Sequence, residues 1–92
     1  MSALIIVDLT PLNNERLSVY SAMATESLIP FDGELLAKGA IEPLHGKTTY
    51  QTKIVIQFPD HEHALNWYHS DAYQKTIPTR DQGMNSQFHL IG

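Results

Sequence analysis

The strongest constraint on the fold is a run of successive apolar residues near the start of the chain, Ala3 to Val7. Branched side chains at successive positions are typical of a β-strand that is buried on both faces. A second run of this kind occupies Ile54 to Ile56. The sequence therefore predicts a sheet with these two strands at its centre.

A helix is expected between these strands, because Asn13 or Asn14 can cap it and Pro30 ends it. Its apolar residues recur at helical spacing at Leu17, Tyr20, Ala24 and Leu28. Strands are then expected over about Glu34 to Leu44 and Thr52 to Phe58, and the turn that joins them falls at His45-Gly46-Lys47.

A second helical region is expected to begin at Asp60, which is a suitable cap. Ser70 can cap a short continuation that ends at Pro78, and Gly83 then falls in a loop. The last strand is expected over Gln87 to Ile91. Ala64, Leu65, Trp67 and Tyr68 form the apolar stripe of this region.

The predicted order of elements is strand, helix, strand, strand, helix, strand, which indicates an α+β, ferredoxin-like βαββαβ domain with a four-stranded antiparallel sheet. The length of 92 residues predicts a single domain over 1–92. Two helices cover only one face, so the other face would expose apolar side chains such as Ile5, Val7 and Val55. We therefore expect a homodimer through that face.

Composition excludes several classes of protein. The net charge is −4 with scattered cations, which argues against nucleic acid as a partner. No apolar run approaches the ~20 residues that cross a membrane, so we expect a cytoplasmic protein without a membrane partner. The chain has no cysteine, which excludes disulfides and thiolate sites.

Motifs for metal, nucleotide or serine-triad chemistry are missing. His61-Glu62-His63 falls at a helix start, where residues two apart point in different directions and do not readily chelate one ion. We expect no metal and no cofactor.

Six polar or amphipathic residues are candidates for lining a cleft between sheet and helices. Five are expected to bind ligand, and His45 is the candidate for acid or base catalysis. As alternatives, His45 is an exposed turn residue, and the aromatic side chains belong to the core. Arg80 could hold an anion or form an ion pair with Asp81, Glu34 or Glu42. The five ligand candidates are Tyr20, Gln57, Trp67, Tyr73 and Arg80.

Three stretches resemble a family of short bacterial proteins known as domain of unknown function 1330. They are Asp32 to Gly39, Ile54 to Pro59 and, most specifically, Ala64 to Gln74. Arg80 and the terminal Leu90-Ile91-Gly92 also match. The resemblance implies the dimeric α/β-barrel form of the ferredoxin-like fold.

The wider superfamily implied by this resemblance includes cofactor-free monooxygenases, lactone isomerases and haem enzymes. The expected function is therefore the binding of a small organic acid or phenol in a sheet–helix cleft by a homodimer. Cofactor-independent isomerase or monooxygenase activity stays open, and a non-catalytic structural or interaction dimer is the alternative.

Overall fold

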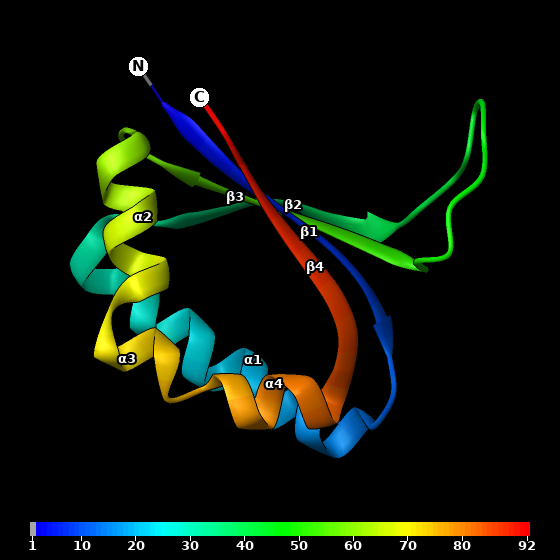
Figure 1. Cartoon of the computed structure of the whole chain (residues 1–92), viewed down its shortest axis with the longest axis horizontal. Coiled ribbons are helices and arrows are strands. Elements are labelled where there is room, and N and C mark those ends of the chain that lie inside the picture. The colour runs from blue at the N-terminus through cyan, green and yellow to red at the C-terminus, as the bar shows by residue number, and fades with distance from the viewer. Residues whose placement is uncertain (1) are drawn as a thin grey trace.

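The computed structural model describes residues 2–92 and contains one antiparallel sheet. Its strands are β1 (Ala3–Pro11), β2 (Glu34–Ala40), β3 (Thr52–Phe58) and β4 (Met84–Ile91). Their order in the sheet is β2-β3-β1-β4, so β1 and β3 are central and β2 and β4 are the edges. This order confirms the ferredoxin-like arrangement and the prediction of two central strands (Figure 1).

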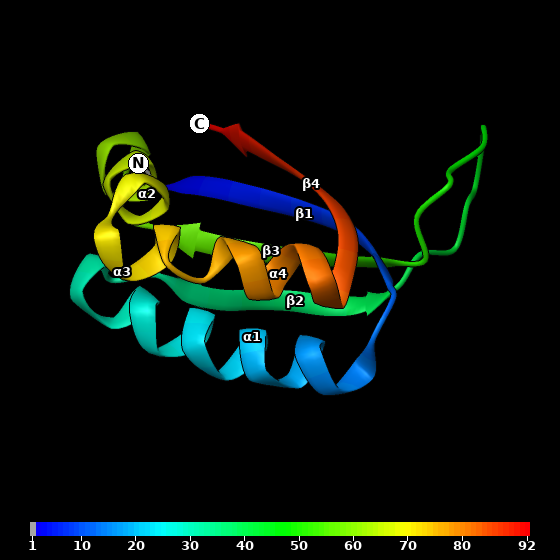
Figure 2. The same ribbon diagram turned by 60° about the horizontal axis from the view of Figure 1, so that its bottom comes forward.

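The helices lie on one side of the sheet (Figure 2). After β1 the chain forms α1 (Asn14–Leu28) and the 3-10 turn η1 (Ile29–Phe31), and after β3 it forms α2 (His61–His69), α3 (Asp71–Gln74) and α4 (Ile77–Gly83). Side chains of Asn13, Asp60 and Ser70 accept hydrogen bonds from backbone amides at the starts of α1, α2 and α3, which confirms these three residues as helix caps.

The core lies between β1 and the helices. On β1, Ala3, Ile5, Val7 and Leu9 are buried against this side. The expectation that Ile5 and Val7 face away from the helices is therefore wrong. The helix-free face instead carries Leu4, Ile6 and Asp8 of β1, because side chains alternate along a strand.

Several boundaries differ from the sequence prediction, among them the start of β4 at Met84 rather than Gln87. β2 ends at Ala40 rather than near Leu44, and the amide of Ile41 makes the last bond across to Gln51. Pro43 cannot donate a ladder hydrogen bond, which favours a longer loop over 41–51. Pro78 does not end a helix but lies in the first turn of α4, where a proline needs no amide hydrogen.

Gly83 was expected in a loop, yet it is the last residue of α4. Its carbonyl accepts hydrogen bonds from the amides of Leu12 and Asn13, at 2.8 and 3.1 Å. A Cβ atom at Gly83 would lie 2.7 Å from the backbone nitrogen of Leu17. The close approach of α4 to α1 thus requires glycine here, and it fixes the helix that carries Arg80.

Candidate functional site

The hydroxyl of Tyr73 is the centre of a polar cluster inside the sheet–helix layer. It shares a hydrogen bond of 2.8 Å with the hydroxyl of Tyr20 and accepts another of 3.2 Å from Nη1 of Arg80. The same Nη1 donates to the hydroxyl of Tyr68, at 3.1 Å. Four helices, α1 to α4, thus each supply one member of the cluster.

Local sequence accounts for the placement of two of these residues. The Ser70 side chain interrupts the helical region and accepts a hydrogen bond from the Tyr73 amide, at 3.2 Å. This break turns Tyr73 inward, where its side chain is fully buried. Pro78 starts α4, whose last turn contains Arg80. The helix cap Ser70 and the first-turn proline Pro78 therefore set the directions from which Tyr73 and Arg80 approach each other.

Besides the two tyrosines, Asp81 and Phe88 contact the side chain of Arg80. Its Nε donates to Oδ1 of Asp81 at 3.0 Å, and its guanidinium lies 5.1 Å from the ring centroid of Phe88. The predicted ion pair is therefore present with Asp81 rather than with either glutamate. Within residues 2–92, Nη2 of Arg80 takes part in no hydrogen bond. This nitrogen is free to bind a ligand.

Electrostatics keep Arg80 charged and the buried phenols neutral. Burial disfavours the charge on Arg80, but hydrogen bonds with Tyr68, Tyr73 and Asp81 outweigh it, and its pKa lies above the ordinary value. Burial also raises the pKa values of Tyr20 and Tyr73. Neutral tyrosines do not cancel the positive charge, and the carboxylate of Asp81 that pairs with Nε is largely exposed, so the guanidinium can still attract an anion.

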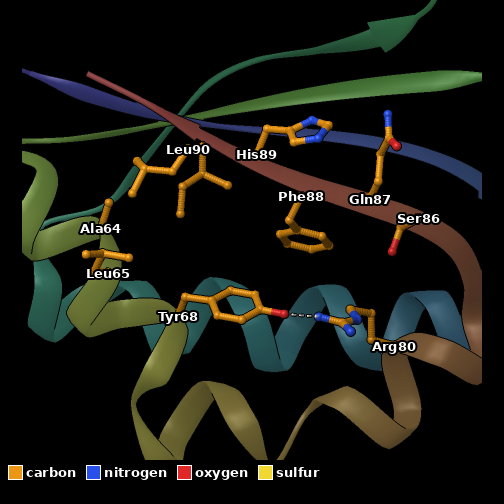
Figure 3. A pocket seen from close by; sticks show the side chains of 10 residues that line it. Ala64, Leu65, Tyr68, Arg80, Ser86, Gln87, Phe88, His89 and Leu90 are labelled. Carbon is orange, nitrogen blue, oxygen red and sulfur yellow. Dashed lines mark hydrogen bonds between the residues drawn. The ribbon is translucent and has the colours of Figure 1, made fainter.

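A cavity of about 390 Å³ opens beside this cluster (Figure 3). We call it the Arg80 cavity. Tyr68 and Arg80 lie along one side of it, and Phe88 and Leu90 of β4 point into it from the other. It therefore combines one cation, one phenol and the polar side chains of Ser86, Gln87 and His89 with apolar wall residues, the mixture expected of a site for a small organic ligand.

Two further ligand candidates, Tyr20 of the cluster and Trp67 beside it, do not line this cavity. Trp67 is 1% exposed, its indole N–H donates to Oγ of Ser27 at 3.0 Å, and its ring centroid is 4.4 Å from that of Tyr73. Tyr20 and Trp67 line a second cavity, under α1. The expected packing of Trp67 against the sheet is confirmed by its contact with Phe58, at 5.5 Å between ring centroids.

Gln57 does not lie in the sheet–helix cleft. Its neighbours Ile56 and Phe58 point into the core, so the side chain of Gln57 lies on the opposite, helix-free face of the sheet. The prediction that it lines the same cleft as Arg80 is wrong for this reason.

His45 is exposed in the loop over 41–51, which projects from the end of the sheet opposite α2 (Figures 1 and 2). It does not line the Arg80 cavity or the cavity under α1. The turn that carries it is not a tight hairpin folded over a cleft, because the strands stop several residues earlier. Within one chain, His45 and Arg80 are not brought together.

Sequence reasoning missed Tyr68 and Phe88 as site residues. Tyr68 was assigned to the apolar stripe of the second helical region, where an aromatic side chain is usually part of the core. Phe88 fell within the expected last strand, Gln87 to Ile91. The available signal was the five-residue spacing of Tyr68 and Tyr73 around the helix cap Ser70, which brings their ring centroids to 5.0 Å.

The histidines of the His61-Glu62-His63 sequence have protein partners. Nδ1 of His61 bonds the carbonyl of Gly92 at 2.9 Å, and Nδ1 of His63 bonds Oδ1 of Asp60 at 2.7 Å. The hydrogen bond with Asp60 raises the pKa of His63. In the part of the chain that the structure describes, no three His, Asp or Glu side chains gather as metal ligands. No helix within 2–92 is long and apolar enough to cross a membrane.

The strand order and the one-sided helices define a ferredoxin-like α+β protein. The chain belongs to the family described as Domain of unknown function (DUF1330), whose model matches residues 2–92. This match confirms the resemblance seen in the sequence. A comparison with curated proteins gives no match.

Several solved structures share the fold. The RPA0582 protein of unknown function from Rhodopseudomonas palustris superposes with a TM-score of 0.80 at 10% identity, covering 98% of this chain and 80% of that chain. The cofactor-independent oxygenase SnoaB from Streptomyces nogalater gives 0.71 at 8% identity, over 99% and 91% of the two chains.

A dimeric ferredoxin-like protein of unknown function from Thermobifida fusca YX gives a TM-score of 0.67 at 10% identity, over 100% of this chain and 91% of that chain. At identities this low the comparisons show a shared fold only. The function has to be inferred from the residues of the site.

Proposed function

We propose that this protein binds a small, partly apolar organic acid or phenol in the Arg80 cavity. The observation that carries the proposal is the guanidinium of Arg80, which is charged, 13% exposed in its side chain, and has its Nη2 free beside apolar walls. A carboxylate or phenolate accepts charge-assisted hydrogen bonds from such a group.

Tyr68 supplies a second donor in this proposal. Its hydroxyl accepts a hydrogen bond from Arg80 and so keeps its own hydrogen available. An anion at Nη2 can receive that hydrogen too, while its carbon skeleton packs against Phe88 and Leu90. Burial of the skeleton and pairing of the charge then favour the same orientation of the ligand.

We also propose that two copies pair through the helix-free face of the sheet. Leu4, Ile6 and Val55 lie together there, since Ile6 pairs with Val55 across β1 and β3. Lys53 and Asp8 form an ion pair of 3.1 Å further along the same face, which gives a polar edge to the apolar patch. The fold is shared with ferredoxin-like proteins described as dimeric.

Catalysis without a cofactor, of isomerase or monooxygenase type, is the extension of this proposal. It is supported by the fold shared with SnoaB and needs an acid or base at the ligand. His45 remains the candidate for that role, and in one chain it lies outside the Arg80 cavity. A non-catalytic interaction dimer is the rival function, and it requires no ligand at Arg80.

Calorimetry with benzoate and phenol as probes tests the binding proposal. Arg80→Met should weaken benzoate binding about tenfold to a hundredfold, because a hydrogen bond to a charged group contributes about 1.5–3 kcal/mol. Arg16→Met is the matched control, since Arg16 is the only other arginine and lies exposed on α1.

Arg80 also bonds three side chains, so Arg80→Lys serves as a milder variant if Arg80→Met does not fold. Lysine keeps the charge and loses the planar fork, and we expect intermediate affinity. Equal benzoate affinity in the wild type and both folded Arg80 variants would refute the anion site, as would a failure of both probes to bind the wild type.

A further inference from the structure

A second cavity, of about 320 Å³, lies between α1 and the β2–β3 side of the sheet. We call it the α1 cavity. Ala24 and Leu28 form its α1 wall, Ile54 and Ile56 form its sheet wall, and Trp67 closes one side. Phe88 is the one residue that it shares with the Arg80 cavity. The two cavities are therefore separate sites.

Small side chains on α1 explain why this space is open. Ser21, Ala24 and Thr25 face the cavity, where larger side chains would fill the gap to the sheet. The hydroxyl of Thr25 donates to the carbonyl of Ser21 at 2.8 Å, so the helix itself satisfies this polar group. The walls consequently offer apolar surface, and few of their polar groups need a hydrogen bond from a ligand.

The mouth of the α1 cavity is apolar and carries one cation. Ile29 is 73% exposed and Leu35 is 60% exposed, which is unusual for large apolar side chains beside an open cavity. Lys38 is the one charged residue in the lining. It forms no ion pair with any residue of 2–92.

We propose that the α1 cavity binds a free amphipathic monocarboxylic acid, with its chain inside and its carboxylate at Lys38. The charge at the mouth selects an anion, and the walls select an unbranched apolar chain. If each heavy atom takes the ~30 Å³ that a water molecule occupies in the liquid, the cavity of about 320 Å³ holds roughly ten heavy atoms. Octanoate has this size.

This site is independent of the binding proposed for Arg80 and compatible with the proposed dimer. Lys38 pairs with Ile54 on the helix side of the sheet, whereas the dimer would use the opposite face. Pairing of two copies would therefore leave the mouth open. The acid differs from a ligand of the Arg80 cavity because its charge lies at the surface and its chain lies in the interior.

Trp67 provides a direct readout, because it is the only tryptophan of the chain and lines the α1 cavity. Titration with octanoate should change its fluorescence, and calorimetry should give the same Kd. Lys38→Met should weaken octanoate binding about twofold to fivefold, the scale of an exposed ion pair. Lys47→Met, in the loop over 41–51, is the matched control and should bind like the wild type.

Ala24→Phe tests the position of the chain by filling the cavity, and it should abolish binding of both octanoate and octan-1-ol. Octan-1-ol lacks the carboxylate, so it should bind Lys38→Met and the wild type equally. Thr25→Leu is the second filling variant if Ala24→Phe fails to fold by circular dichroism. Thr25→Leu should reduce octanoate binding and leave the melting temperature of the protein nearly unchanged.

Three results would overturn the inference. One is no octanoate binding at millimolar concentration, and another is unchanged octanoate affinity in a folded filling variant. The third is loss of octanoate affinity in Arg80→Met but not in Lys38→Met, which would place the acid in the Arg80 cavity instead. If benzoate does not bind but octanoate does, the α1 site stands. Only the proposed binding of an acid or phenol in the Arg80 cavity is then refuted.

Discussion

Tyr73 shows how much of the site depends on a single hydroxyl group. Its side chain is fully buried, yet its oxygen contacts both Tyr20 and Arg80. A buried hydroxyl without a partner is costly, so each of these three groups stabilises the position of the others. The orientation of the Arg80 guanidinium is thus determined in part by residues that no ligand needs to touch.

We expect Tyr73→Phe to lower the free energy of unfolding by about 1–3 kcal/mol, since it leaves the buried Tyr20 hydroxyl without a partner. Urea denaturation measures this change. Tyr20→Phe should cost a similar amount, and the double variant should cost less than the sum, because removing both partners leaves no orphaned hydroxyl between them. Additive costs would show that the 2.8 Å contact contributes nothing to stability.

At the scale of the elements, α2 is tied to the sheet by one large side chain. Trp67 contacts Phe58 of β3, and its N–H bonds Ser27 near the end of α1. The apolar stripe of α2 was visible in the sequence, and it placed Trp67 correctly. The Ser27 partner was not visible, because it is 40 residues away along the chain.

Trp67→Ala should lower the free energy of unfolding by about 3–5 kcal/mol, because it opens a large void in a packed core. Asn66→Ala, on the exposed side of the same helix, should change it by less than ~0.5 kcal/mol. Chemical denaturation of both variants checks the difference. A loss below ~1 kcal/mol for Trp67→Ala would contradict the role of this side chain as the anchor of α2.

At the scale of the whole molecule, the helix-free face is the surface that the fold leaves uncovered. Val55 lies at its centre beside Ile6. If two copies pair there, an unpaired charge at this position is buried on association, at a cost of several kcal/mol.

Val55→Glu should therefore convert a dimer into a monomer, as measured by light scattering at micromolar concentration. Val19→Glu is the matched control, because Val19 is 46% exposed on α1, away from that face, and should leave the mass unchanged. A wild-type mass of one chain would contradict the proposed dimer directly. Circular dichroism of Val55→Glu separates dissociation from unfolding.

The order of elements, the two central strands and three helix caps could be predicted from the sequence alone. These features depend on neighbours along the chain, such as the side chain of Asp60 that accepts a bond from the amide of His63, at 2.8 Å. The sequence also predicted that Tyr20, Trp67 and Tyr73 lie near the cleft, on helical stripes that face the sheet, and that Arg80 lies near it just past Pro78. Such interactions act over a few residues and leave a periodic pattern.

The face of each strand that the helices cover depends on how the elements pack in three dimensions. Over Ala3 to Val7 both sets of alternate residues are apolar, so this run does not distinguish Ile5 from Ile6. The structure places Ile5 in the core cluster that also contains Trp67 and Tyr73. That choice places Gln57 on the far face. Tertiary packing also sets the hydrogen bonds of Tyr73 and the distance between His45 and Arg80. These residues are far apart in the chain, so whether they meet depends on how whole elements pack.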